Sequence, residues 1–142
     1  MDYKKTMKKY IYERDDRKCR FCQRELLFRK ISLDHYLPKS KKGPDDLYNL
    51  VLCCKKCNKL KKNRTPSDYE SVMIENFIKG IKDRKITAPG LGIKNKMLLE
   101  MAEAIERIED IGEDVVFQSS KHRFYVKKGH IKKIVNIGES VE

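Results

Sequence analysis

The fold is decided by residues 19–58, which read CRFCQRELLFRKISLDHYLPKSKKGPDDLYNLVLCCKKCN. A Cys-x-x-Cys pair stands at each end, Cys19/Cys22 and Cys54/Cys57. A two-residue spacer lets both sulfurs of a pair face one metal ion, and two pairs complete a tetrahedral shell of thiolates. We therefore predict a closed, structural zinc site. A redox role for either pair is the alternative, but neither pair lies in a thioredoxin-like βαβ context.

The segment between the two pairs is longer than a simple zinc ribbon needs, so it contains an inserted structure. Residues 26–33 are rich in β-prone side chains and lead into Asp34-His35. Gly and Pro break residues 38–46 into a loop. The apolar run 49–53 predicts a short buried strand in which Cys53 is a small buried hydrophobe. Residues 55–62 predict a helix.

The rest of the chain predicts mainly helices, followed by strands. Residues 3–17 predict a basic helix, and Ser67 with Glu70 forms a capping box for a second helix. Lys85–Gly92 contains Pro and Gly and predicts a linker. A further helix is expected from Asn95, with a coiled-coil-like spacing of apolar residues; packing on the body and a homodimer seam are both open. The apolar positions of the helix that begins at Asn95 are Leu98, Met101, Ile105 and Ile108. Three short strands are expected after it, at 115–118, 123–126 and 131–137.

The order of the polar residues in this insert resembles the HNH endonuclease family, which has the ββα-metal fold. The family pattern has Asp-His-x-x-Pro between the cysteine pairs, then Asn-Leu, an Asn or His after the last cysteine, Lys and Thr-Pro. The matching residues here are Asp34-His35, Pro38, Asn49-Leu50, Asn58, Lys61 and Thr65-Pro66. The resemblance implies an α+β fold: a zinc-stapled HNH nuclease core in residues 1–66 with flanking helices. Residues 67–142 would be a small helix and β-strand appendage of unknown role.

Phosphodiester hydrolysis needs an activated water and neutralisation of charge at phosphorus. A histidine is largely neutral at physiological pH and can accept the proton of water, so His35 is the expected general base. Asp34 and Asn58 would supply oxygen ligands to a catalytic Mg²⁺ or Mn²⁺, which keeps most of its water. By resemblance, Asn49 would brace the loop and orient His35 through a hydrogen bond, without binding the metal ion. The candidates for phosphate contact are Lys41, Lys42, Lys61 and Arg64.

The basic charge of the chain is concentrated in its first part. The formal net charge is +12, and residues 1–66 contain 20 Lys and Arg against 8 Asp and Glu, whereas residues 67–142 contain 13 of each. Such a patch attracts a polyphosphate backbone, although a solubilising surface has the same composition. We expect a cytoplasmic, metal-dependent DNA endonuclease with no membrane partner. The alternatives are a zinc-dependent DNA-binding module without catalysis, and an interaction protein that docks a protein partner or a second copy through residues 67–142.

Overall fold

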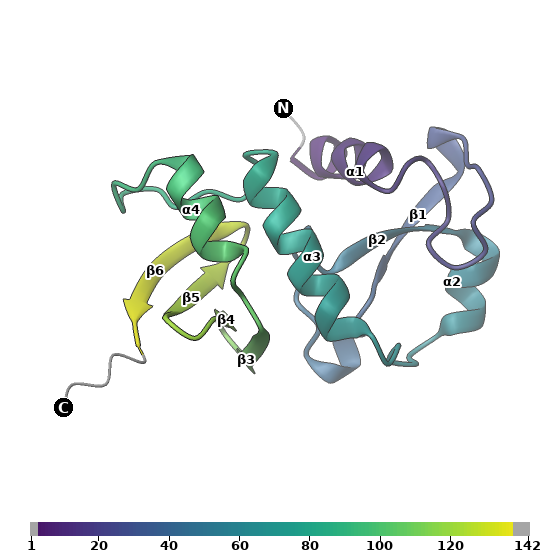
Figure 1. Cartoon of the computed structure of the whole chain (residues 1–142). Coiled ribbons are helices and arrows are strands. Elements are labelled where there is room, and N and C mark those ends of the chain that lie inside the picture. The colour runs from purple at the N-terminus through teal and green to yellow at the C-terminus, as the bar shows by residue number, and fades with distance from the viewer. Residues whose placement is uncertain (1–2, 138–142) are drawn as a thin grey trace. The chain divides into compact units, whose positions relative to one another are not determined.

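The computed structural model describes residues 3–137, and the chain divides into two compact units, residues 1–66 and 67–142 (Figure 1). The first unit contains the helix α1 (Tyr3–Arg14), the strands β1 (Ile31–His35) and β2 (Leu50–Cys54), and the helix α2 (Lys55–Lys61). The predicted α+β class is confirmed. No helix in the described part of the chain is long and apolar enough to cross a membrane.

β1 and β2 form an antiparallel hairpin, with Ile31 opposite Cys54 and His35 opposite Leu50. All five residues of β2 are buried because α1 packs on it from one side and α2 follows it directly. Two 3₁₀ turns flank β1, at Phe28–Lys30 and Lys39–Lys41. The expected strand over 26–33 therefore begins later, at Ile31. The result is a ββα unit in which α2 follows the end of β2 directly and packs on β1.

A charged pair after α1 attaches this helix to β2. Arg14 is almost fully buried and donates hydrogen bonds to the carbonyls of Leu47 (2.8 Å) and Leu50 (2.6 Å). Asp15 pairs with Arg14 and accepts a hydrogen bond from the amide of Leu52 at 2.8 Å. Left-handed backbone at Asp16 (φ 59°) then ends the helix, which is shorter than the predicted range 3–17.

The second unit places two helices against a four-stranded antiparallel sheet. The helices are α3 (Tyr69–Lys82) and α4 (Asn95–Ala102), and the strands run in the order β3 (Arg107–Ile111), β4 (Val115–Gln118), β5 (His122–Lys127) and β6 (His130–Asn136). The core of this unit is aromatic: the ring of Phe77 in α3 stacks on Phe117 at 4.0 Å between centroids, with Phe124 beside them at 6.3 Å.

Two expectations for this half of the chain are wrong. The helix that begins at Asn95 was expected to include Ile108, but α4 ends at Ala102 and Ile108 lies in β3, so the apolar positions with coiled-coil-like spacing do not share one helix. Asp68 precedes α3, and the Glu70 carboxylate accepts a hydrogen bond from the amide of Ile108 (2.7 Å) where a capping box was expected.

The segment 85–92 connects α3 to α4 inside the second unit, where it is not a free linker. Ile86 is fully buried and the carbonyl of Thr87 accepts a hydrogen bond from Ile131 at 2.7 Å. The chain divides into its two units between Pro66 and Ser67.

Candidate metal centre and active site

The four cysteines of the two Cys-x-x-Cys pairs come together as predicted. The sulfur atoms of Cys19, Cys22, Cys54 and Cys57 all lie within 4.8 Å of one another. Those of Cys22 and Cys54 are 3.9 Å apart, close to the separation of about 3.8 Å that tetrahedral zinc–sulfur bonds of ~2.3 Å require. Four thiolates at this spacing fit zinc and leave no coordination position open, so a metal ion here would staple the fold.

Each cysteine pair lies in a turn whose backbone amides face the sulfurs. The first turn closes through hydrogen bonds from the amide of Gln23 to the carbonyl of Cys19 (3.0 Å) and from the amide of Cys19 to the carbonyl of Arg24 (2.9 Å). In the second turn, Cys54 caps α2, because its sulfur accepts a hydrogen bond from the amide of Cys57 at 3.4 Å. In the second turn the sulfur of Cys54 is therefore a hydrogen-bond acceptor, as a thiolate is, and the thiolate is the form of cysteine that binds a metal ion.

Cys19, one of the four clustered cysteines, and Cys53, which is not among them, differ in chemistry. Burial would raise the pKa of Cys19, but hydrogen bonds from the backbone of Cys22 and Cys54 lower that pKa to about 6, which favours the thiolate that a metal ion binds. Burial raises the pKa of Cys53 well above its ordinary value, and its thiol donates a hydrogen bond to the carbonyl of Cys54 at 3.2 Å. Cys53 is fully buried, as expected of a small hydrophobe.

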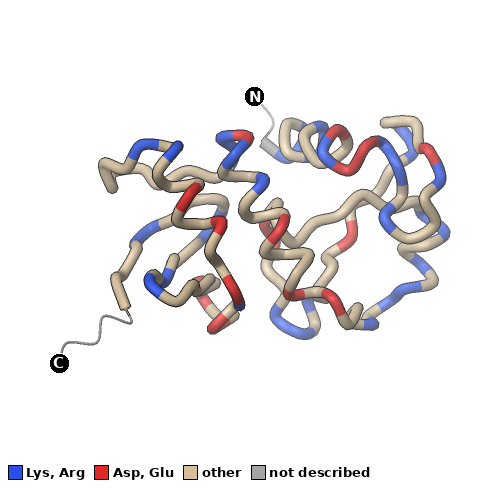
Figure 2. Tube along the Cα trace, viewed as in Figure 1, with Lys and Arg blue, Asp and Glu red and all other residues tan. Residues whose placement is uncertain are grey.

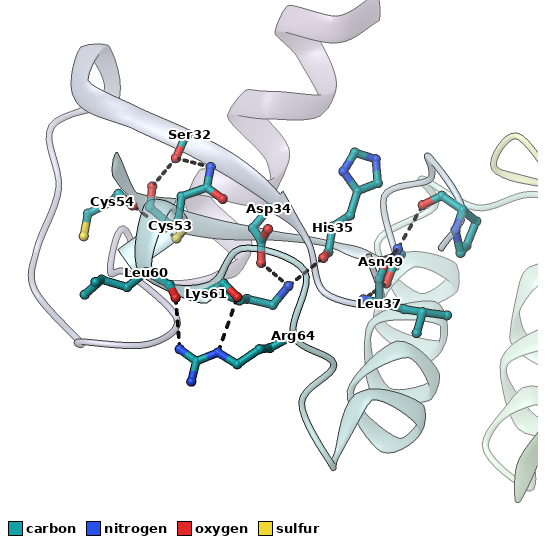
Figure 3. A network of polar contacts seen from close by, with 12 residues as sticks. Ser32, Asp34, His35, Leu37, Asn49, Cys53, Cys54, Leu60, Lys61 and Arg64 are labelled. Carbon is teal, nitrogen blue, oxygen red and sulfur yellow. Dashed lines mark hydrogen bonds and ion pairs between the residues drawn. The ribbon is translucent and has the colours of Figure 1, made fainter. Parts of the chain in front are cut away.

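Asp34 and His35 lie at the end of β1, and their side chains leave the strand in different directions (Figure 3). Asp34 faces α2, where its Oδ2 forms an ion pair with the Nζ of Lys61 at 3.0 Å. His35 faces the loop between the strands, with its Nε2 3.1 Å from Oδ1 of Asp45. Neighbouring residues on a strand alternate between faces, so the two side chains reach different surroundings although they are adjacent in sequence.

The contact with Asp45 is one that sequence reasoning missed. Asp45 is followed by a second aspartate, and nothing in the spacing of the motif distinguishes the two. The carboxylate of Asp45 accepts a hydrogen bond when Nε2 of His35 is protonated, which leaves Nδ1 as the nitrogen that can accept a proton. Asp45 therefore selects the ring tautomer that a base at Nδ1 requires.

Asn49 braces the loop, as the sequence predicts, and does so entirely through backbone groups. Its Oδ1 accepts a hydrogen bond from the amide of Leu37 (2.9 Å), and its Nδ2 donates to the carbonyls of Leu37 and Pro44 (3.0 Å each). Gly43 completes the brace, because a Cβ there would lie 1.7 Å from the carbonyl oxygen of Leu37. The expected hydrogen bond from Asn49 to His35 is wrong, because the described partners of the Asn49 side chain are backbone groups of Leu37 and Pro44. Any effect of Asn49 on the histidine therefore acts through the backbone of the loop.

Replacing Asn49 with alanine should destabilise the first unit. Asn49 is fully buried, and its removal leaves buried backbone groups of Leu37 and Pro44 without partners, so we expect a loss of about 2–4 kcal/mol in the free energy of unfolding. Urea unfolding of the zinc-loaded protein measures this loss. The control is Asn63→Ala, at an exposed asparagine of the same unit, which should change stability by less than about 0.5 kcal/mol. Equal stability of the two variants would contradict the role of Asn49.

The oxygen groups that a catalytic cation would use lie on one side of the ββα unit. Nδ2 of Asn58, on α2, donates to the hydroxyl of Ser32 at 3.3 Å, and Ser32 is two residues before Asp34 on the same strand. The side-chain amide oxygen of Asn58 and the carboxylate of Asp34 are hard oxygen ligands of the kind that Mg²⁺ or Mn²⁺ binds, together with water. The donor chemistry therefore fits a divalent ion, although Lys61 already neutralises the carboxylate.

The four residues expected to contact phosphate fall into two groups. Lys41 and Lys42 are exposed on the loop between β1 and β2 and can reach a ligand. Lys61 is buried and its ammonium group points inward, donating to the carbonyl of His35 at 3.1 Å, so the expectation of a phosphate contact is wrong for this arrangement. Arg64 is exposed but donates to the carbonyls of Leu60 (3.0 Å) and Lys61 (3.4 Å), where it satisfies the end of α2 (Figure 3).

Lys and Arg are spread over the helices and loops of the first unit (Figure 2). The second unit is neutral overall, yet its charges are segregated in sequence. Residues 119–137, which include β5 and β6, contain six Lys and Arg and no acidic residue. Glu113 and Asp114, before β4, pair with two of these lysines, Lys127 and Lys132. The zero net charge of residues 67–142 therefore arises from charges of opposite sign that partly neutralise each other within one sheet.

Comparison with known proteins places a family on the segment that contains the site. Residues 19–67 match the model of the HNH endonuclease family, a range that contains both cysteine pairs and the Asp34-His35 pair. No curated protein matches the chain. The second unit lies outside the family match except for its first residue, Ser67.

Proposed function

We propose that this protein hydrolyses phosphodiester bonds in DNA with the help of a divalent cation, since residues 19–67 match the HNH endonuclease family model. The observation that carries the proposal is that Asp34, His35 and Asn58 belong to one ββα unit. The four-cysteine cluster joins the turn before β1 to the junction of β2 and α2 in this unit. By family resemblance, the products would have 5′-phosphate and 3′-hydroxyl ends. A single site of this kind cuts one strand, so one copy of the protein would nick the duplex.

His35 is the residue that would take the proton of the attacking water. Its Nε2 faces Asp45, so Nδ1 is the nitrogen that would accept the proton. As the water oxygen bonds to phosphorus, the bond from phosphorus to the leaving oxygen breaks, and that oxygen takes a proton from solvent. The side chain of His35 is 23% exposed, so solvent and a phosphate can both reach it. Asn49 acts as a positioning residue, because it holds the loop that also contains Asp45.

Asp34 and Asn58 would hold the divalent cation. When bound, such an ion neutralises charge at the phosphate and at the leaving oxygen. Asp34 is fixed by the end of β1 and Asn58 by the first turns of α2, two elements that pack against each other. With only two protein ligands, affinity for the ion should be low in the absence of DNA. The four-cysteine site has a separate task, because its closed thiolate shell cannot bind substrate.

Incubation of the zinc-loaded full chain with supercoiled plasmid tests this function. Adding Mg²⁺ or Mn²⁺ should convert the plasmid to the nicked form, and a buffer without these ions should not. EDTA also removes zinc, so the protein must be dialysed free of other divalent ions beforehand and its zinc content measured before and after the reaction. Absence of cleavage with either ion would favour a zinc-dependent DNA-binding module that lacks catalysis.

Affinity for DNA should depend mainly on the basic residues of the first unit. We expect the double variant Lys41→Ala with Lys42→Asn to bind a DNA duplex several-fold more weakly, and to lower the slope of log affinity against log salt by about two. Asparagine is chosen for Lys42 because its backbone is left-handed, with φ of 67°. Fluorescence anisotropy at several salt concentrations measures both quantities.

The matched control removes the same charge from the second unit. Lys96 and Lys121 are exposed, and their replacement by alanine should leave the affinity and the salt slope nearly unchanged. If this control weakened binding as much as the first variant, Lys96 of α4 and Lys121, which directly precedes β5, would have to be part of the DNA-binding surface.

A further inference from the structure

Lys61 is the best-buried ammonium group of the candidate site, and it is not used by the mechanism above. It is the last residue of α2, and its side chain is 7% exposed. Its Nζ lies 3.0 Å from Oδ2 of Asp34 and 3.1 Å from the carbonyl oxygen of His35 (Figure 3). One ammonium group therefore contacts both members of the Asp-His pair, in one case through the side chain and in the other through the backbone.

A buried lysine in this position lowers the stability of the fold unless its charge is paired. Burying an ammonium group and a carboxylate removes both from water, and only a close pair compensates for the loss of hydration. The side chain of Asp34 is only 9% exposed, and the ammonium group of Lys61, 3.0 Å from its Oδ2, is the charged partner that the structure gives it. Lys61 therefore holds the Asp34 side chain in place while no metal ion is bound.

We propose that Lys61 is an internal counter-cation that occupies the cation-binding side of Asp34 and that a divalent ion must displace. The inference rests on the proposed function, because it names a competitor for the ion that this function needs. A single positive charge within hydrogen-bond distance of the carboxylate repels a doubly charged ion at the same oxygen. Lys61 thus positions Asp34 and the His35 backbone in the free protein and lowers the affinity of the free protein for divalent ions.

Titration of the zinc-loaded full chain with Mn²⁺ alone tests the competition without any measurement of cleavage. Lys61→Met removes the charge, and Lys61→Gln removes it while keeping a hydrogen-bond donor in case the first variant folds poorly. We expect either variant to bind Mn²⁺ at least about tenfold more tightly than the wild type in electron paramagnetic resonance of free Mn²⁺. The matched control is Lys59→Met, which removes the same charge from an exposed position of the same helix and should leave Mn²⁺ affinity within about twofold.

Thermal unfolding provides the second readout. Without Mn²⁺, Lys61→Met should melt at a lower temperature than the wild type, because the Asp34 carboxylate loses its partner. Saturating Mn²⁺ should raise the melting temperature of the variant more than that of the wild type. A purely structural ion pair predicts the lower melting temperature but equal Mn²⁺ affinity, and that result would overturn the proposal. Failure of both proteins to bind Mn²⁺ would also overturn it.

These outcomes can be separated from those of the proposed function. Tighter Mn²⁺ binding by the Lys61 variants, together with a wild type that cuts no plasmid, would support the counter-cation and reject the nuclease. Plasmid cleavage by the wild type, together with equal Mn²⁺ affinity in all variants, would support the nuclease and reject the counter-cation.

Discussion

His35→Ala is expected to reduce plasmid cleavage by about 10²–10⁴-fold while leaving the fold, the zinc content and the DNA affinity close to those of the wild type. The reduction follows because the variant has no group at this position to accept the proton of water. The remaining properties should be preserved because the ring of His35 is partly exposed and contacts Asp45, which is itself 66% exposed at its side chain. Single-turnover cleavage at saturating Mg²⁺, with zinc measured on the same samples, provides the comparison.

Asn58→Ala is the informative companion to this variant. Asn58 is assigned to the cation, so raising Mg²⁺ or Mn²⁺ should restore part of its cleavage, whereas no concentration of either ion should restore His35→Ala. Equal cleavage by the wild type and His35→Ala would indicate a contaminating nuclease or a different base. Rescue of both variants by the ion would remove the distinction between base and ligand on which the assignments rest.

Cys54→Ser is expected to release the metal ion and to unfold the first unit. Binding of a structural zinc ion supplies about 10 kcal/mol or more to small zinc domains, so a unit of this size should not remain folded without it. The second unit has its own aromatic core, with Phe77 stacked on Phe117, and should stay folded. Elemental analysis of zinc and two-dimensional NMR of the backbone amides measure both effects, with roughly half of the dispersed signals expected to collapse.

The neighbouring cysteine provides the control for this experiment. Cys53→Ala removes a buried sulfur one residue away, yet Cys53 is not among the four clustered sulfurs. This variant should retain one zinc ion per chain and lose only about 1–2 kcal/mol from the small cavity. Full zinc retention by Cys54→Ser, or loss of zinc by Cys53→Ala, would show that the metal ligands are assigned incorrectly.

Short-range patterns predict the parts of the structure that depend on neighbouring residues. Each Cys-x-x-Cys pair fixes its own turn, so the four-cysteine cluster follows once the two turns meet. The strands β4, β5 and β6 are close to the predicted ranges because each contains a short apolar stretch that packs into the core, fully buried in β4 and alternating with less buried residues in β5. β3 was missed because its residues, Arg107–Ile111, are mostly exposed and charged, and pairing with β4 makes them a strand. The prediction extended α4 too far. The apolar residues beyond Ala102 keep a helical spacing in the sequence, although in the structure they belong to a turn and a strand.

The sequence by itself determined which residues could carry the chemistry, since the order Asp34, His35, Asn49 and Asn58 inside two cysteine pairs is a linear property. Only the tertiary structure decided what each of them contacts. Lys61 reaches Asp34 and the carbonyl of His35, which is 26 residues away in the chain, because α2 packs on β1. Asp45 reaches His35 because the loop folds back around Gly43 and is held by Asn49. Such contacts depend on the packing of distant segments, and no local spacing of residues specifies that packing.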